Sequence, residues 1–134
     1  MESITYQIPI TIKETLENND FVIGGIAINT TITDNNHKFL SEELRNSALT
    51  LKNKPLLTDH EDKISAIAGK VIEASFDEIN SSVKFKAKIN NTNQGKLAKE
   101  LIKNGDLTTV SIGANVESFD EDEGVIIPKG IKFK

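Results

Sequence analysis

The sequence predicts a mainly β domain with flanking helices (an α+β fold), built as a small curved or closed β-barrel of about six or seven strands. Three observations lead to this fold class. Segments in which apolar and polar residues alternate recur along most of the 134 residues. Only two segments, near residues 41–51 and 93–103, have the apolar spacing of amphipathic helices. A glycine pair, Gly24 and Gly25, interrupts one predicted strand, as is typical of bulges that curl a sheet.

The first two predicted strands lie near the N-terminus. Residues Ile4–Ile12 alternate apolar and polar side chains, and Pro9 predicts an edge strand or a kink because it lacks a backbone N–H. Turn-forming residues follow, and a second strand is expected over Phe21–Ile28. The polar stretch Thr30–Lys38 indicates a loop, in which we expect His37 to be exposed to solvent.

A first helix is expected from Ser41, whose hydroxyl could cap the free N–H groups of the first turn. Pro55 ends this segment, and the apolar Leu56–Leu57 leads into His60 within an acidic stretch, Asp59–Asp62. The buried stripe of the helix is expected to consist of Leu40, Leu44, Ala48 and Leu51.

Two long strands and a second helix are expected in the middle of the chain. The strands cover Ile64–Phe76 and Val83–Ile89, and in the second one lysines alternate with apolar residues, which predicts one buried and one basic, solvated face. The helix covers Asn93–Lys103 and ends at Gly105, because glycine readily adopts the left-handed conformation found at helix ends. Its predicted buried residues are Leu97, Ala98, Leu101 and Ile102.

The last predicted strands surround an acidic hairpin tip, Asp120–Glu123. Leu107–Phe119 alternates so that Val110 and Ile112 fall on one face, and Ser111 and Gly113 fall on the other. The small Gly113 is expected to leave room for a substrate backbone beside Ser111. Further strand segments are expected at Val125–Ile127 and Ile131–Lys134. Because the second one ends without a turn or a polar tail, we expect the domain to be truncated at its C-terminal end.

Composition narrows the class of protein. The length fits one domain over residues 1–134. A net charge of −4 argues against nucleic acid as a ligand, and the absence of cysteine excludes disulfides and a cysteine nucleophile. No window reaches the roughly 18 apolar residues of a membrane span, and the N-terminus lacks the features of a signal peptide. We therefore expect a cytoplasmic protein that binds neither membranes nor nucleic acid.

Metal and cofactor sites are not expected. The carboxylates next to His60 are consecutive residues that point in different directions on an extended chain, and His37 does not stand at ligand spacing from them. Asp120–Glu123 lacks the spaced ligands of a calcium loop, and the Gly24–Gly25 pair is not followed by the helix that a phosphate cradle requires.

From the residues alone, Ser111 allows two interpretations. It is either an inert hydroxyl on a polar strand face or a nucleophile, which would need a base. The only histidines are His37 and His60, so Ser111 with His60 is a candidate pair that only the tertiary fold could bring together.

An ordered series of segments resembles the prohead (capsid maturation) serine proteases of tailed bacteriophages, which are distantly related to the herpesvirus assembly protease. The resemblance covers the chain from about Phe21. Its segments are Pro55–His60, the glycine-bearing strand Ile67–Val71, the helix end Lys103–Leu107 and the strand Thr109–Ala114. It implies a small β-barrel flanked by helices, a fold like that of the herpesvirus protease.

The resemblance also implies roles for two residues, with Ser111 as the nucleophile and His60 as the general base. It implies that the enzyme cuts the scaffold and the N-terminal region of the major capsid protein inside the immature capsid in the host cell, and cuts itself. It also allows a homo-oligomer. The noncatalytic alternative is a β-rich structural or assembly module of the virion.

A third residue that orients the imidazole lies downstream of the serine in relatives, and we expect it to lie beyond Lys134. Glu117 shares the face of Ser111 but would be about 20 Å away on a straight strand. Asp59 and Asp62 are more simply surface residues. We therefore expect the chain to be weakly active or inactive as it stands, since loss of the orienting acid costs roughly 10⁴ in turnover in the serine protease template.

Overall fold

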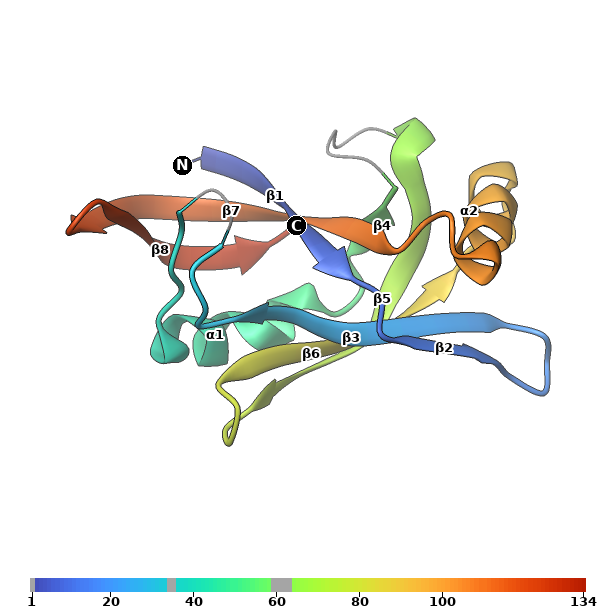
Figure 1. The fold of residues 1–134 in the computed structure, drawn as a ribbon, viewed down its shortest axis with the longest axis horizontal. Helices are drawn as coiled ribbons and strands as arrows, with labels where there is room; N and C mark the ends of the chain where they lie inside the picture. Colours follow the sequence, from blue (N-terminus) through green and yellow to red (C-terminus); the bar gives the residue numbers. More distant parts are fainter. Residues whose placement is uncertain (1, 34–35, 59–63) are drawn as a thin grey trace.

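A computed structural model describes residues 2–33, 36–58 and 64–134. Figure 1 shows a strand-rich structure with one helix (Asn93–Asn104) at the end of the sheet and the other (Ser41–Ser47) below the uppermost strands. The strands are β1 (Glu2–Pro9), β2 (Ile12–Thr15), β3 (Phe21–Asn29), β4 (Pro55–Leu57), β5 (Ile67–Asp77), β6 (Ser82–Ile89), β7 (Thr109–Asp122) and β8 (Val125–Phe133). The α-helices are α1 (Ser41–Ser47) and α2 (Asn93–Asn104), and the short 3₁₀ helices are η1 (Ala48–Leu51) and η2 (Ile64–Ala66).

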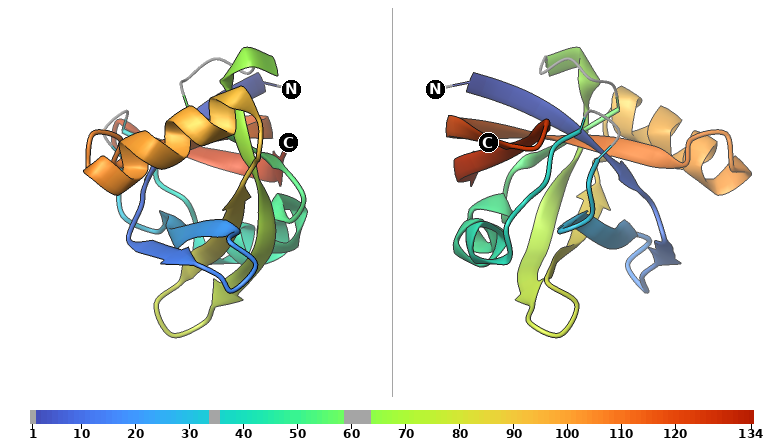
Figure 2. Two further views of the ribbon diagram at one scale, coloured as in Figure 1. Left: turned by 90° about the vertical axis from the view of Figure 1, so that its right-hand side faces the viewer. Right: turned by 60° about the vertical axis from the view of Figure 1, so that its left-hand side comes forward.

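All eight strands of the described residues belong to one antiparallel sheet. The order is β1-β7-β4-β5-β6-β3-β2, and β8 also pairs with β7. The sheet curves around a common interior (Figure 2) but does not close, because no pairing joins β1 to β2 in the described part of the chain. The chain crosses this opening at Ile10 and Thr11, whose N–H groups donate to Thr108 O (2.9 Å) and Gly24 O (3.0 Å).

This crossing explains one of the two paired glycines. A Cβ at Gly25 would lie 2.7 Å from Thr11 Oγ1 and 3.1 Å from Pro9 O, so a side chain would collide with the crossing segment. The φ angle of Gly25 is +154°, a conformation that other residues rarely adopt. The predicted bend of the sheet therefore coincides with the place where the chain passes from β1 to β2.

The core consists mainly of aliphatic side chains from the inner faces of the strands and from α1. Leu44, Leu51 and Phe39 are fully buried against it, and so are Val110, Ile112, Ala114 and Val116 of β7, as the alternation predicts. The predicted fold class is confirmed. The described residues form eight strands. Ile4–Ile12 divides at the crossing into β1 and β2, Val125–Ile127 and Ile131–Phe133 belong to one strand, β8, and the short segment Pro55–Leu57 forms the additional strand β4.

The two helices correct two details of the sequence prediction. Ser41 does not cap α1: the N-cap is Leu40, with no side-chain capping bond, and Ser41 Oγ donates to Ser81 Oγ at 3.1 Å. In α2, Leu97 is 53% exposed, because Gly95, Ala98 and Ile102 form the buried side of the helix instead. No helix in the described ranges is long and apolar enough to cross a membrane.

Candidate active site

Ser111 lies on β7 with strands on both sides. Its register partners are Gln7 of β1 and Leu57 of β4. Its side chain points away from Val110 and Ile112 because successive side chains of a strand alternate between the two faces of the sheet. Only 3% of Ser111 is exposed, so the polar face of the strand is covered at the serine.

The sheet divides next to Ser111. One edge of β7 pairs with β4 at Ser111 and with β8 from Ala114 onward, where Ala114 lies opposite Phe133. The N–H of Lys134 continues the β8 pairing by donating to Gly113 O at 3.0 Å. Figure 1 shows β4 and β8 reaching β7 at separate places along its length. Ser111 therefore sits where one neighbouring strand ends and another begins.

Lys134 occupies the space next to the serine. A Cβ at Gly113 would lie 3.1 Å from Lys134 Cε and 3.2 Å from Lys134 Cγ, so the lysine side chain lies over the glycine. Lys134 Nζ donates to Ser3 Oγ at 2.7 Å, and Ser3 Oγ donates to Asn115 Oδ1 at 3.1 Å. The room that Gly113 was expected to leave for a substrate is filled by this side chain. Sequence reasoning missed Lys134, since no local pattern links it to Gly113.

The predicted base, His60, lies outside the described residues, as do Asp59 and Asp62. The described residues on either side of it are held together. Thr58 directly follows Leu57, and both its N–H (2.9 Å) and its Oγ1 (3.2 Å) donate to Ala66 O. The two ends of the segment that carries His60 are thus joined next to the strand position that pairs with Ser111.

His37 was expected to be exposed to solvent, and this was wrong: only 8% of it is exposed. Its ring lies 6.4 Å from that of Tyr6 and 5.8 Å from that of Phe119. Burial lowers its pKa, and neither His37 Nδ1 nor Tyr6 Oη has a hydrogen-bond partner among the described residues. Tyr6 lies opposite Ile112, so this cluster is on the core side of β7, away from Ser111.

Glu117, the carboxylate on β7 that was considered as an orienting group for the imidazole, lies away from Ser111. Its side chain lies beside Gly130 of β8, where an added Cβ would be 2.6 Å from Glu117 Oε2. It is exposed and six residues along the strand from Ser111. The structure does not bring Glu117 together with the serine.

Comparisons with known proteins agree with this architecture. The family model of caudovirus prohead serine proteases matches residues 8–131. The structure of the bacteriophage T4 capsid assembly protease is similar with a TM-score of 0.71 and 15% identity, over 98% of this chain and 91% of that chain. A search of curated proteins finds no match. The family match spans nearly the whole chain, and the chain therefore belongs to the caudovirus prohead serine protease family.

Proposed function

We propose that this chain is a serine endopeptidase of viral capsid maturation, with Ser111 as the nucleophile and His60 as the general base. The observation that carries the proposal is the pairing of Leu57 with Ser111. His60 follows Leu57 by three residues in the sequence, and Leu57 pairs directly with Ser111 near the start of β7.

Chain connectivity supports this assignment. A stretch of three residues spans at most about 11 Å, and directly paired residues of antiparallel strands have Cα atoms roughly 5 Å apart. His60 therefore belongs to a short segment that begins beside Ser111. His37 is a poor alternative, because it is buried on the opposite face of the sheet.

The chemistry is acyl transfer. The imidazole of His60 removes the proton of Ser111 Oγ while the oxygen attacks the scissile carbonyl carbon. The tetrahedral intermediate collapses, the C–N bond breaks, and the imidazolium gives its proton to the leaving amine. Water, activated by the same imidazole, then hydrolyses the ester and restores the hydroxyl of Ser111. A strand supports such a nucleophile well because its backbone is fixed on both sides.

The substrates follow from the family. We propose that the enzyme acts inside the immature capsid in the host cell on the scaffold and the N-terminal region of the major capsid protein, and that it also cuts itself. Membership of the prohead protease family supports this assignment, and the similar T4 structure is that of a capsid assembly protease.

Co-expression with the capsid and scaffold proteins of the same phage tests the proposal. Even slow cleavage by the unmodified chain should shorten a detectable fraction of both partners during co-expression, whereas Ser111→Ala should leave them intact. Ser118→Ala is the matched control, because Ser118 lies on the same strand but is exposed, and it should cleave normally. Cleavage by the Ser111→Ala variant would contradict the proposal.

A further inference from the structure

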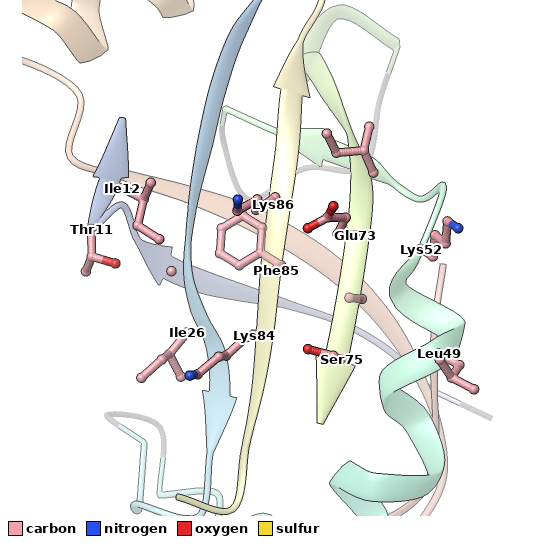
Figure 3. Close-up of a pocket in the computed structure, with 13 residues that line it drawn as sticks. Thr11, Ile12, Ile26, Leu49, Lys52, Glu73, Ser75, Lys84, Phe85 and Lys86 are labelled. Atoms are coloured by element: carbon pink, nitrogen blue, oxygen red, sulfur yellow. The ribbon is translucent and has the colours of Figure 1, made fainter. Parts of the chain in front are cut away.

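A hollow of about 670 Å³ lies on the outer face of the sheet (Figure 3). It crosses β2, β3, β6 and β5, and η1 stands at its far side. Ser111 and Gly113 are not among its lining residues, which come from segments 11–12, 25–26, 49–52, 72–75 and 84–86. The proposed proteolytic chemistry makes no use of this surface.

Exposed apolar side chains gather around the hollow. Ile12 is 42% exposed, Ile26 40% and Leu49 78%. In Figure 3, Ile12 and Ile26 stand on one side and Leu49 on the other, with charged side chains between them. Single exposed apolar residues are ordinary, but here three of them border one hollow that also carries charged side chains, so one partner can contact both kinds of group. The hollow therefore suits a partner that inserts apolar side chains.

The strand at the centre of the hollow, β6, has no capacity for a further strand, because it pairs with β3 on one side and with β5 on the other. A partner lying across these strands must therefore satisfy its own backbone hydrogen bonds, as a helix does. Strands are about 4.8 Å apart, so β2 and β5 are about 14 Å apart, the length of a helix of roughly ten residues.

The charges on the hollow favour an acidic partner. Three lysines, Lys52, Lys84 and Lys86, line it together with one carboxylate, Glu73, although the chain as a whole has a net charge of −4. Lys84 Nζ lies 3.1 Å from Asp77 Oδ2, but Asp77 also accepts hydrogen bonds from Ile79 and Asn80 in its turn. The Asp77 side chain is only 15% exposed, but that of Lys84 is 54% exposed, so the ammonium group stays accessible to a partner.

We propose that this hollow is a docking site for an acidic amphipathic helix of a partner protein. Apolar side chains that recur over about three turns on one face of that helix contact Ile12, Ile26 and Leu49, while its flanking carboxylates meet Lys84 and Lys86. The site anchors the chain to its partner independently of the chemistry at Ser111.

Fluorescence anisotropy with the full chain tests the proposal. The probe is a fluorescein-labelled 14-residue helical peptide with leucines on one face and glutamates on the other, and its counterpart carries lysine at every glutamate position. We expect only the glutamate peptide to bind, and Ile26→Ser or Leu49→Ser to weaken its binding at least tenfold. The double variant Lys84→Glu with Lys86→Glu should lose the glutamate peptide and gain the lysine peptide.

The matched control is Leu97→Ser with Lys96→Glu on α2, which removes an exposed leucine and reverses a lysine outside the hollow. This control should bind like the unmodified chain, and circular dichroism should show that every variant is folded. Equal binding of both peptides, or binding unaffected by Ile26→Ser and Leu49→Ser, would overturn the proposal. So would tighter binding of a single-stranded oligonucleotide, or self-association in sedimentation that Leu49→Ser abolishes.

Discussion

The side chain of Lys134 lies over Gly113, two residues from Ser111 on the same face of β7. The contact is close, because an added Cβ at Gly113 would be 3.1 Å from Lys134 Cε. Two hydrogen bonds hold Lys134 in place. Its backbone N–H donates to Gly113 O, and its ammonium group donates to Ser3 Oγ. It therefore bridges from the end of β8 across β7 to β1, beside a serine that is itself buried.

We predict that shortening Lys134 increases access to position 111. The chain has no cysteine, so Ser111→Cys introduces a single thiol whose reaction with Ellman's reagent measures its accessibility. Adding Lys134→Ala should raise that rate roughly tenfold, because an accessible thiolate reacts faster than a covered one. Lys129→Ala, farther along β8, is the control and should leave the rate unchanged. An unchanged rate with Lys134→Ala would show that the lysine does not restrict access.

Gly95→Ala is predicted to destabilise the protein although it lies in a helix. In a helix interior, replacing glycine by alanine ordinarily stabilises the helix by up to about 1 kcal/mol. Here the new Cβ would lie 1.9 Å from Asn90 O, a backbone atom that cannot easily move. We expect a net loss of about 2 kcal/mol in the free energy of unfolding, measured by urea denaturation. Lys96 is the next residue and is exposed, so Lys96→Ala should change the free energy of unfolding little. A more stable Gly95→Ala protein would mean that α2 does not pack this closely.

His37 is predicted to make stability depend on pH in the weakly acidic range. Burial lowers the pKa of His37 below its ordinary value of 6.5, so the unfolded chain binds this proton at a higher pH than the folded chain does. Stability should therefore fall as the pH decreases from about 6.5 toward the lowered pKa of the folded state. Glu2, Asp120 and Glu121 line the hollow beside this histidine.

Urea denaturation at several pH values, compared between the unmodified chain and His37→Leu, isolates this contribution. The unmodified chain should lose stability relative to the variant as the pH falls from 7 to 5. Parallel curves would contradict the buried, neutral state of His37.

Much of the fold could be predicted because periodicity depends on local sequence. The alternation in β7 and β6 identified their buried faces, and Gly105, at a φ of +82°, ends α2 as expected. The errors share a cause, since each depends on contacts between distant segments. His37 is buried because Tyr6 and Phe119 pack around it, and Leu97 is exposed because Gly95 brings a different face of α2 to the sheet.

In the candidate site, too, local features could be predicted from the sequence, whereas contacts between distant segments could not. The alternation of Thr109–Val116 correctly separated Ser111 from the core residues, but composition could not reveal that its face is covered. The position of Leu57 beside Ser111 depends on the register of two strands more than 50 residues apart, and Lys134 reaches Gly113 only through the β7–β8 hairpin. The pairing of His60 with Ser111 rests on family resemblance and chain connectivity, and it remains a prediction.

Labelling with a fluorophosphonate, followed by peptide mass spectrometry, tests the central claim most directly. The reagent counts modified serines rather than turnovers, so it also detects a slow nucleophile. We predict one adduct, on Ser111, that disappears in Ser111→Ala and forms far more slowly in His60→Ala, while Ser118→Ala labels normally. An adduct on another serine, no adduct at all, or labelling of Ser111 that is unaffected by His60→Ala would contradict the assignment of this pair.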